Sequence, residues 1–279
     1  MAGNRCGIME IVAVLHMHST CSDGKYSPGI IVGKVIKAGL STFALSDHDT
    51  LDHIPIINDY IKNKNINIQF IAATELSCEY DVDSIYILAY LQKNEINHLS
   101  DIFNKMNFER KKVIREMGMK LNKLGYNVDF ESIIKTIKNP GRPHLGNALI
   151  KAGYFKKLDD VFDQVLGFNK SAYVKKNKPL ANIVINRIRE LGGISIIAHP
   201  GIYSNLSKTE NISQLDLDGL EVFHPAHSKT QIQYYLNYAK KNNLLVTGGS
   251  DYHGWDNKIS VGSFGIDVNY LNNFTKLLN

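Results

Sequence analysis

The alternation of short apolar runs with amphipathic stretches is the feature that most constrains the fold of this chain. Runs that read as buried strands lie at residues 8–17, 41–46, 66–74, 84–91, 193–200, 219–225, 244–251 and 260–266. Helical stretches follow most of them, at residues 28–39, 52–64, 180–191, 229–243 and 269–278. This alternation is typical of α/β proteins with parallel strands. At 279 residues, the chain is long enough for one barrel with a large core.

The pattern changes between residues 97 and 170, where several segments look helical and no run reads as a strand. The helical segments lie at residues 97–124, 130–138, 143–153 and 158–167. Glycine and proline in the stretches 139–143 and 167–173 break this region into pieces. We therefore predict a barrel formed by residues 1–96 and 171–279, with a helical insertion at residues 97–170.

The composition is that of an ordinary globular protein, with 44% hydrophobic residues and a net charge of +5. This small basic excess fits a protein that binds phosphorylated ligands, but solvated helix surfaces give the same balance. Three widely spaced cysteines, Cys6, Cys21 and Cys78, argue against a disulfide framework and favour a reducing cytoplasm. No stretch approaches the length of a membrane span.

The ionisable residues that could bind metal fall mostly at the carboxyl ends of the expected strands. In a parallel α/β barrel these ends meet at one mouth, where such folds place their active sites. His16 and His18 close the first run, and a spacing of two in an extended chain puts both imidazoles on one face. Asp23 follows in a turn that can bring its carboxylate back to this mouth.

The second and third runs also end in polar groups. Asp47, His48 and Asp49 end the second run, and Glu75 ends the third. One of the two aspartates could cap the helix near residues 52–64, which leaves His48 as the metal-binding group. We expect Glu75 to bridge two cations, although a capping or ion-pair role is the alternative.

Two late runs complete the set, because His199 follows one strand and Asp251 and His253 follow another. All the donors are nitrogen or oxygen atoms, which suits Mn²⁺, Zn²⁺ or Fe²⁺ with open coordination positions. Two such ions can activate a bridging water and hold the oxygens of a phosphate, so that no serine or cysteine nucleophile is required. The predicted metal ligands are His16, His18, Asp23, His48, Glu75, His199, Asp251 and His253.

In this order, the motifs resemble those of the polymerase and histidinol phosphatase (PHP) family of metal-dependent phosphoesterases. The motifs are LHMHSTCSDG, ALSDHDT, ATELS, IIAHPG and GGSDYHG. The resemblance implies a distorted (β/α)7 barrel, similar to a TIM barrel, with two or three divalent ions. It implies that His16, His18 and Asp251 bind one ion and that His199 binds another, with Glu75 bridging the two. The third ion is expected to take Asp23, His48 and His253 as ligands.

Three further segments, GRPHLGNALIKAGY, SAYVKKNKPL and DGLEVFHPAHS, resemble the members that dephosphorylate nucleoside 3′,5′-bisphosphates and trim short RNA from the 5′ end. By that resemblance Arg142, His144 and His227 contact substrate phosphates, and His227 protonates the leaving oxygen. A surface ion pair for Arg142 and a helix cap for His144 are the alternatives. The expected partner is a small phosphorylated nucleotide or a short RNA end, with no membrane and no obligate protein partner.

Two positions depart from the family pattern, since Val14 stands where members carry Asp and Tyr86 where they carry His. The first change would remove a carboxylate that supports a ligand histidine. Because the second change replaces a usual histidine, the expected number of bound ions is two or three. His53, His98 and His224 are given no role, and the first two are expected on solvent-facing helix surfaces. Histidinol-phosphate phosphatase and a degenerate nucleotide-binding accessory module are the alternative functions.

Overall fold

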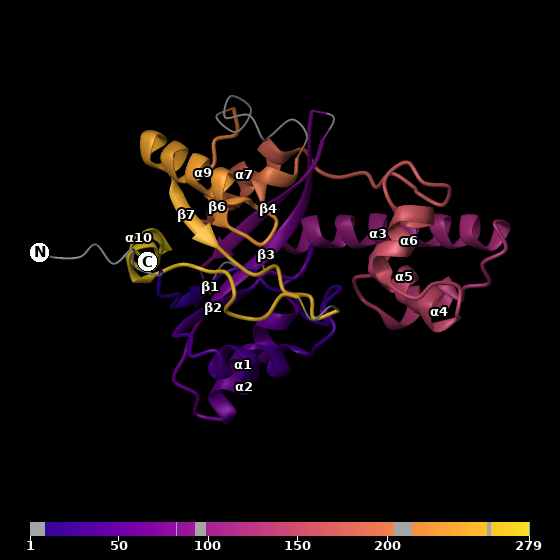
Figure 1. Cartoon of the computed structure of the whole chain (residues 1–279), viewed down its shortest axis with the longest axis horizontal. Coiled ribbons are helices and arrows are strands. Elements are labelled where there is room, and N and C mark those ends of the chain that lie inside the picture. The colour runs from indigo at the N-terminus through magenta and orange to yellow at the C-terminus, as the bar shows by residue number, and fades with distance from the viewer. Residues whose placement is uncertain (1–8, 82, 93–98, 204–213, 256–257, 279) are drawn as a thin grey trace, which may run out of the picture.

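A seven-stranded sheet forms the body of the molecule in the computed structural model, which describes residues 9–81, 83–92, 99–203, 214–255 and 258–278. The strands lie side by side in the order of the chain (Figure 1). They are β1 (Ala13–Val14), β2 (Thr42–Leu45), β3 (Gln69–Tyr80), β4 (Asp83–Leu91), β5 (Ile194–Ile197), β6 (Gly219–Phe223) and β7 (Leu245–Gly248). The sheet is nearly closed into a barrel with helices around it, as expected from the sequence.

One strand runs against the predicted direction. β4 is antiparallel to both β3 and β5, whereas the other neighbouring pairs are parallel. Two residues separate β3 from β4, which is far too short for the crossover that parallel strands need. The expectation of parallel strands throughout was therefore wrong at β4.

The run at residues 260–266 is not a strand, contrary to the prediction. Its described pairing with the sheet is a single bridge between Ala13 and Ile266. Gly262 lies at a φ of 90°, which turns the chain away from an extended path. Gly265 packs so closely on the backbone that an added Cβ would lie 2.3 Å from the Ala13 carbonyl oxygen. These residues cross the end of the barrel opposite the strand-end motifs and do not extend the sheet.

The barrel closes where the chain after β7 meets the chain after β1. The Leu15 N–H donates to the Gly248 carbonyl at 3.1 Å, and the Asp251 N–H donates to the His16 carbonyl at 3.0 Å. Gly249 allows this approach, because an added Cβ would lie 2.3 Å from the Cβ of His16. The first and last strand-end motifs are therefore direct neighbours.

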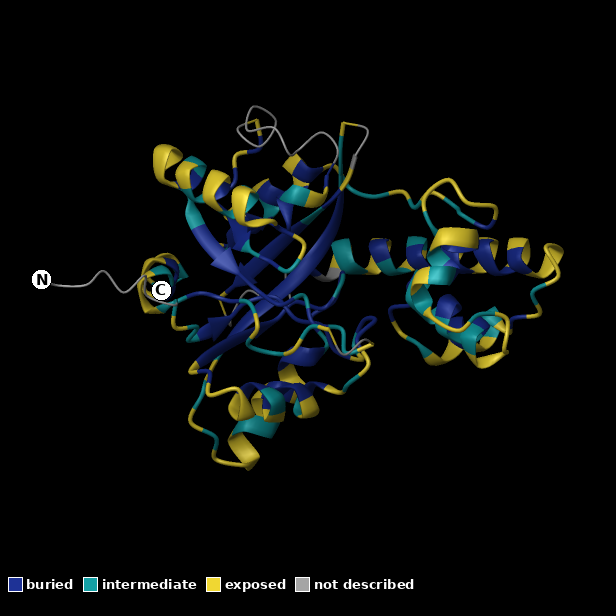
Figure 2. Ribbon diagram, in the orientation of Figure 1, coloured by how far each residue is buried: buried dark blue, intermediate teal, exposed yellow. Residues whose placement is uncertain are grey.

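Among the described residues, five helices cover the barrel, and their buried apolar sides face the sheet (Figure 2). They are α1 (Pro28–Lys37), α2 (His53–Asn63), α7 (Ala181–Glu190), α9 (Lys229–Asn242) and α10 (Val268–Leu278). Helix α10 covers the end of the barrel away from the strand-end motifs. There Phe274 packs edge-on against the fully buried Tyr90, with the ring centroids 4.8 Å apart.

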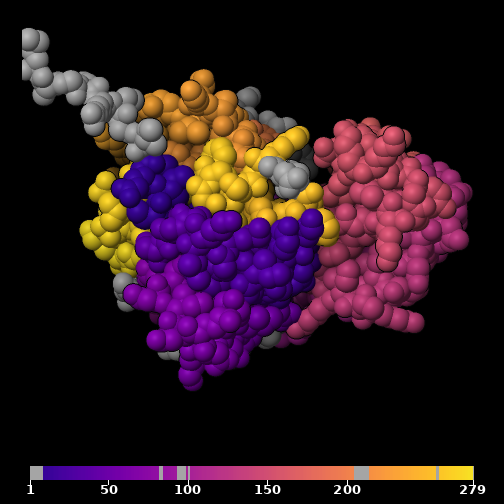
Figure 3. Space-filling model, turned by 60° about the horizontal axis from the view of Figure 1, so that its bottom comes forward, coloured from indigo at the N-terminus to yellow at the C-terminus, as the bar shows by residue number. Residues whose placement is uncertain are grey.

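A group of helices between β4 and α7 forms a lobe beside the barrel (Figure 3). It contains α3 (Ser100–Lys123), α4 (Phe130–Thr136), α5 (Arg142–Lys151), α6 (Leu158–Val161) and the π-helical turn η2 (Phe162–Leu166). These helices share an apolar cluster that includes Met117, Leu145 and Leu166. The predicted insertion begins at residue 97, which lies outside the described residues, so its boundaries stay predictions. Among the described helices, none is both long enough and apolar enough to cross a membrane.

Candidate metal centre

Three buried side chains and the partly exposed Asp251, from three strand ends, converge at the mouth of the barrel. The Nε2 atoms of His16 and His18 lie 3.1 Å apart, and both imidazoles are fully buried. Glu75 places Oε2 3.4 Å from the His16 Nε2 and 3.3 Å from the His18 Nε2. Asp251 places Oδ1 at 3.4 and 3.0 Å from the same two nitrogens. This spacing suits donors that surround a shared cation.

A second set of donors lies beside the first, on the side of the loop that follows β1. It consists of His18, Asp23, His48 and His253, whose ligand atoms all lie within 4.8 Å of one another. Asp23 Oδ1 is 3.2 Å from the His253 Nε2, and its Oδ2 is 3.7 Å from the His48 Nε2. The indole of Trp255 donates to the Asp23 carbonyl at 2.6 Å, which holds this loop in place.

His199 completes the set from the end of β5. Its Nε2 lies 3.1 Å from Glu75 Oε1, so that Glu75 has one oxygen toward His199 and the other toward His16 and His18. His199 adopts a φ of 31°, because the chain turns sharply there into the 3₁₀ turn Pro200–Ile202. The structure thus brings all eight predicted ligands together, and their binding of metal stays a prediction.

The chemistry of these donors fits divalent cations. Among the described side chains, His18 Nδ1, His48 Nδ1 and Glu75 Oε2 are buried without a well-aligned hydrogen bond, although His48 Nδ1 and Glu75 Oε2 lie 3.0 Å apart. An unpaired polar atom in a buried site costs free energy, and a coordinated cation removes that cost. All the donors are nitrogen or oxygen atoms, as in open catalytic sites.

Protons compensate part of the carboxylate charge when no ion is bound. Burial lowers the pKa of His253, but Asp23 and Asp251 outweigh burial and raise this pKa to about 10. Burial lowers the pKa of His48 to about 4 despite Glu75 and Asp23, so that this imidazole is neutral and ready to coordinate. A cation that enters the site has to displace the proton of His253.

Comparison with known proteins assigns these motifs to a family, because residues 15–185 match the PHP domain. The chain belongs to the PHP family. A 5′-3′ exoribonuclease from Haemophilus influenzae is 30% identical over 251 residues, which cover 86% of this chain and 90% of that protein. A 3′,5′-nucleoside bisphosphate phosphatase from Chromobacterium violaceum is 26% identical over 92% of this chain and 90% of its own length.

The fold of this PHP protein is also found among solved structures. A crystal structure from Bifidobacterium adolescentis, assigned as a metal-dependent phosphoesterase, aligns with a TM-score of 0.87 and 25% sequence identity. The alignment covers 95% of this chain and 96% of the other. The seven-stranded, nearly closed barrel is therefore the PHP fold.

Glu221, on β6, supports the PHP centre and was missed from the sequence. It is fully buried and accepts a hydrogen bond from the His16 Nδ1 at 3.0 Å, which leaves the Nε2 of that ring free to face the cluster. It also accepts the His199 backbone N–H at 2.9 Å. Although Val14 stands where the family carries Asp, Glu221 supplies a supporting carboxylate to His16. The acid inside the apolar run GLEVF was the available signal.

Two histidines without a predicted role are placed differently from expectation, and a third cannot be placed. His53 is fully buried, with Nδ1 3.0 Å from Asp47 Oδ2, so it is not a solvent-facing helix residue. His224 is also buried and lies beside the PHP centre, with Nε2 3.4 Å from Asp251 Oδ2. The Ala226 N–H donates to its Nδ1, which places the proton of a neutral His224 on Nε2. His98 lies outside the described residues.

The two aspartates beside His48 do not cap α2, contrary to the prediction. Asp52 is the N-cap residue of that helix. Asp47 instead accepts hydrogen bonds from the Ser19 N–H at 2.7 Å and from the Ser22 hydroxyl at 2.6 Å, which shapes the loop that carries Asp23. Asp49 points the other way and accepts from Arg110 on α3 at 2.7 Å. The motif SDHDT thus connects the loop, the metal centre and the helical lobe.

The predicted substrate residues of the lobe lie at the start of α5. The His144 Nδ1 accepts the Gly141 N–H at 2.9 Å, so this histidine does cap the helix. Burial lowers the pKa of His144, and the negative charge of Asp23 opposes this shift. The Arg142 guanidinium stacks 5.3 Å from the Phe162 ring centroid. Contacts of Arg142 and His144 with a substrate stay predictions.

His227, the predicted acid, has both ring nitrogens engaged by the backbone. Its Nδ1 donates to the Val222 carbonyl at 2.8 Å, and its Nε2 accepts the Gly201 N–H at 3.1 Å. Burial lowers the pKa of His227, which keeps the ring neutral. In this arrangement the ring has no N–H free to protonate a leaving oxygen. The acid role stays a prediction, and it requires the Nε2 to leave Gly201.

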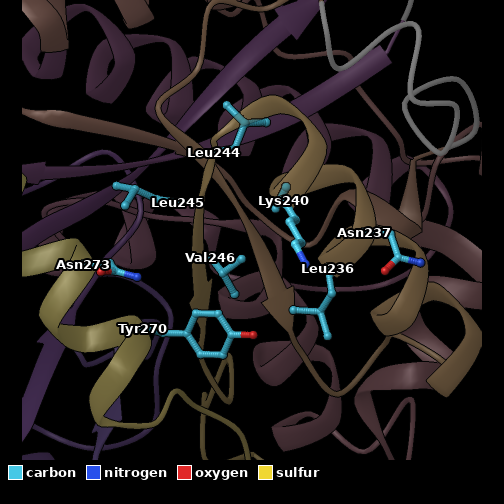
Figure 4. A pocket seen from close by; sticks show the side chains of 9 residues that line it. Leu236, Asn237, Lys240, Leu244, Leu245, Val246, Tyr270 and Asn273 are labelled. Atoms are coloured by element: carbon cyan, nitrogen blue, oxygen red, sulfur yellow. The ribbon is translucent and has the colours of Figure 1, made fainter.

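A separate pocket of about 310 Å³ lies at the other end of the barrel (Figure 4). Its walls come from α9, the start of β7 and α10, and include Leu236, Leu244 and Tyr270. None of the predicted metal or substrate residues is among those that line it.

Proposed function

We propose that this protein is a metal-dependent phosphoesterase that removes the 3′-phosphate from a nucleoside 3′,5′-bisphosphate. Trimming of short RNA from the 5′ end, one nucleotide at a time, is an extension of the same chemistry. The observation that carries the proposal is the convergence of eight nitrogen and oxygen donors at one barrel mouth, with Glu75 between two of the groups. The bisphosphate phosphatase and exoribonuclease relatives support the choice of substrate.

Two or three divalent ions, Mn²⁺, Zn²⁺ or Fe²⁺, are the proposed cofactors. One group of ligands is His16, His18, Glu75 and Asp251, and His199 approaches Glu75 from the far side. The other is His18, Asp23, His48 and His253. When bound, such ions activate water and stabilise the negative charge of the phosphate during displacement.

The side chains around the ligands have separate tasks in this proposal. Glu221 fixes the tautomer of His16 through the 3.0 Å bond to Nδ1, so that Nε2 is a donor to metal. Arg142 and His144 bring positive charge and N–H groups to the substrate phosphates from the lobe of residues 97–170. His227, in the loop after β6, is the third proposed contact to the substrate phosphates, and its Nε2 has to leave the Gly201 N–H to make that contact.

The cytoplasm is the proposed location, because Cys21 and Cys78 are both free thiols in the structure. A small phosphorylated nucleotide or a short RNA end is the proposed partner. The nucleotide phosphatase and RNA relatives support this class of ligand over histidinol phosphate.

The decisive experiment measures bound metal and turnover of a nucleoside 3′,5′-bisphosphate in the same preparations. The variants Asp251→Ala and His18→Ala remove donors from the shared group, and we expect activity to fall by about 10²–10³-fold with loss of metal. Asp163→Ala changes an exposed acid on the lobe and is the matched control. Undiminished turnover in both ligand variants rules the proposal out, and turnover of histidinol phosphate in place of nucleotides corrects the substrate.

A further inference from the structure

A short extended segment returns the chain from the lobe to the barrel and passes over the mouth. The Glu79 N–H at the top of β3 donates to the Pro179 carbonyl at 2.9 Å, and Glu79 also forms a bridge with Leu180. Side chains two residues apart in an extended chain point to the same side. Lys176 and Lys178 therefore share one side of this segment, and both are only partly exposed.

Lys176 reaches a carboxylate that another cation already neutralises. Its Nζ lies 3.1 Å from Asp49 Oδ2, and the Arg110 Nε donates to the same oxygen at 2.7 Å. Asp49 also accepts the Ser77 N–H at 2.7 Å. The side chains of Lys176 and Arg110 are only 15% and 10% exposed. Two cations in poor contact with water thus share one negative charge.

Lys178 adds a further positive charge. Its ammonium lies 4.9 Å from the centroid of the Tyr86 ring and contacts the Ser84 hydroxyl. Among the described residues, these contacts supply no carboxylate for Lys178. Within the described part of the chain, Asp49 is the one carboxylate that these contacts supply to Arg110, Lys176 and Lys178, so that basic groups outnumber the acid three to one. A buried charge without a partner is unfavourable, so a site of this kind favours an anion.

The cations lie one layer of side chains above the metal centre. Glu75 and Ser77 are two residues apart on the same face of β3, a rise of about 7 Å. Ser77 binds Asp49 and is paired with Tyr86 across the sheet. The Tyr86 ring lies 5.3 Å from the His48 ring and 5.8 Å from the His199 ring, between centroids. The 3′- and 5′-phosphates of one nucleoside can span this separation.

We propose that Lys176 and Lys178, together with Arg110, hold a second phosphate of the substrate that does not react, while the metal centre holds the ester that is cleaved. The inference rests on the proposed function and deepens it, because it identifies the residues that select a substrate with two phosphates. A phosphate group offers three oxygens to the two lysines, and its negative charge favours their protonated form. The second phosphate comes from a mononucleotide or from the 5′ end of an RNA.

The acid–base properties of the lysines agree with an empty anion site. Burial, followed by Arg110, lowers the pKa of Lys176 to about 7, although Asp49 opposes this shift. Burial also lowers the pKa of Lys178 to about 8. A bound phosphate reverses both shifts, because it stabilises the protonated ammonium groups.

The test compares two substrates that differ only in the second phosphate, a nucleoside 3′,5′-bisphosphate and the corresponding nucleoside 3′-monophosphate. In the double variant Lys176→Gln with Lys178→Gln, we expect kcat/KM for the bisphosphate to fall by about 10–100-fold, mainly through KM, while the 3′-monophosphate changes by less than about twofold. Lys175→Gln is the matched control, since Lys175 is 66% exposed and pairs with Glu79. The double variant with arginine at both positions should restore the preference.

An equal loss of kcat/KM on both substrates overturns the proposal, because the lysines would then act on the reacting ester or on the fold. An unchanged preference for the bisphosphate over the 3′-monophosphate also overturns it. RNA as the source is tested with short RNA that carries either a 5′-phosphate or a 5′-hydroxyl. Loss of the preference for 5′-phosphate in the double glutamine variant supports the site.

A binding measurement separates this inference from the proposed function. The probe is a nucleoside 5′-monophosphate, titrated into the metal-loaded proteins by calorimetry. We expect at least about tenfold weaker binding to the double glutamine variant than to the wild type and Lys175→Gln. This result supports the lysine site even if the protein turns over no nucleotide. A lack of turnover would then contradict the proposed function but not the lysine site. Equal affinity in all three proteins overturns the site.

Discussion

The metal centre and the layer of cations above it are built in opposite ways. The centre gathers carboxylates and imidazoles at strand ends, where Glu75, Asp23 and Asp251 carry negative charge. The upper layer gathers Arg110 and Lys176 from the lobe and the returning segment, with one carboxylate between them. The centre therefore needs cations and the upper layer needs an anion. A metal-bound substrate with a second phosphate satisfies both.

Asp49 is the residue that joins the two layers. It lies next to His48 in the sequence, but its φ of 52° turns its side chain away from the centre and toward α3. Burial raises the pKa of this carboxyl, but Arg110 and Lys176 outweigh burial and hold the pKa well below its ordinary range. A substitution of Asp49 should therefore disturb the two layers more than any other change proposed below.

Replacing Asp49 with alanine should have the largest effect on stability. It leaves Arg110 and Lys176 buried without a carboxylate, and we expect the free energy of unfolding to fall by about 3–5 kcal/mol. Urea denaturation followed by circular dichroism measures this change. Asp52→Ala removes an exposed ion pair with Lys138 and should cost less than about 1 kcal/mol. If both variants lose the same small amount, the buried cations do not depend on Asp49.

A medium effect is expected at Glu221, which supports the metal centre from below. Glu221→Gln keeps the shape of the side chain but weakens its hold on the His16 Nδ1, and metal affinity should fall by about 10–100-fold. Competition with a chelator of known affinity measures the change. Glu190→Gln, at an exposed pair with Arg187, is the control. Unchanged affinity in Glu221→Gln would mean that His16 needs no carboxylate partner.

The smallest expected effect is a change in the number of protons released when metal binds. The pKa of His253 in the metal-free protein is about 10, so that the imidazole is protonated at neutral pH and must lose this proton to coordinate. Metal affinity should therefore rise as the pH rises toward 10 and fall in acid. Calorimetry in two buffers of different ionisation enthalpy counts the protons released. His253→Gln should release about one proton fewer, and an unchanged count contradicts the assignment.

The sequence predicted the metal centre better than its surroundings, for a physical reason. Polar groups such as His16, Asp251 and Glu75 interrupt apolar runs at their ends, and barrel geometry brings these ends together. Glu221 has no such position, because it lies inside an apolar strand, and only the closed barrel shows that it faces His16. The antiparallel direction of β4 could not be predicted either, since an apolar run looks the same in both orientations.

The upper layer depends on tertiary packing, which local sequence does not encode. The lysines of SAYVKKNKPL have no periodicity that predicts burial, and the contacts of Lys176 with Asp49 and of Pro179 with Glu79 depend on the fold. His53 likewise was expected to be an exposed helix residue, because its contact with Asp47 depends on how the segment after β2 packs against α2. The orientation of His227 depends on the backbone of Gly201, a residue of another loop.

The close approach of Gly249 to His16 has a consequence for biosynthesis. The seam between the first and last strands joins donors that are more than two hundred residues apart in the chain, since His16 and His18 lie on one side and Asp251 and His253 on the other. A nascent polypeptide cannot assemble this cluster until residues 249–253 have left the ribosome. An ion held by donors from both sides of the seam would link the two edges and oppose their separation.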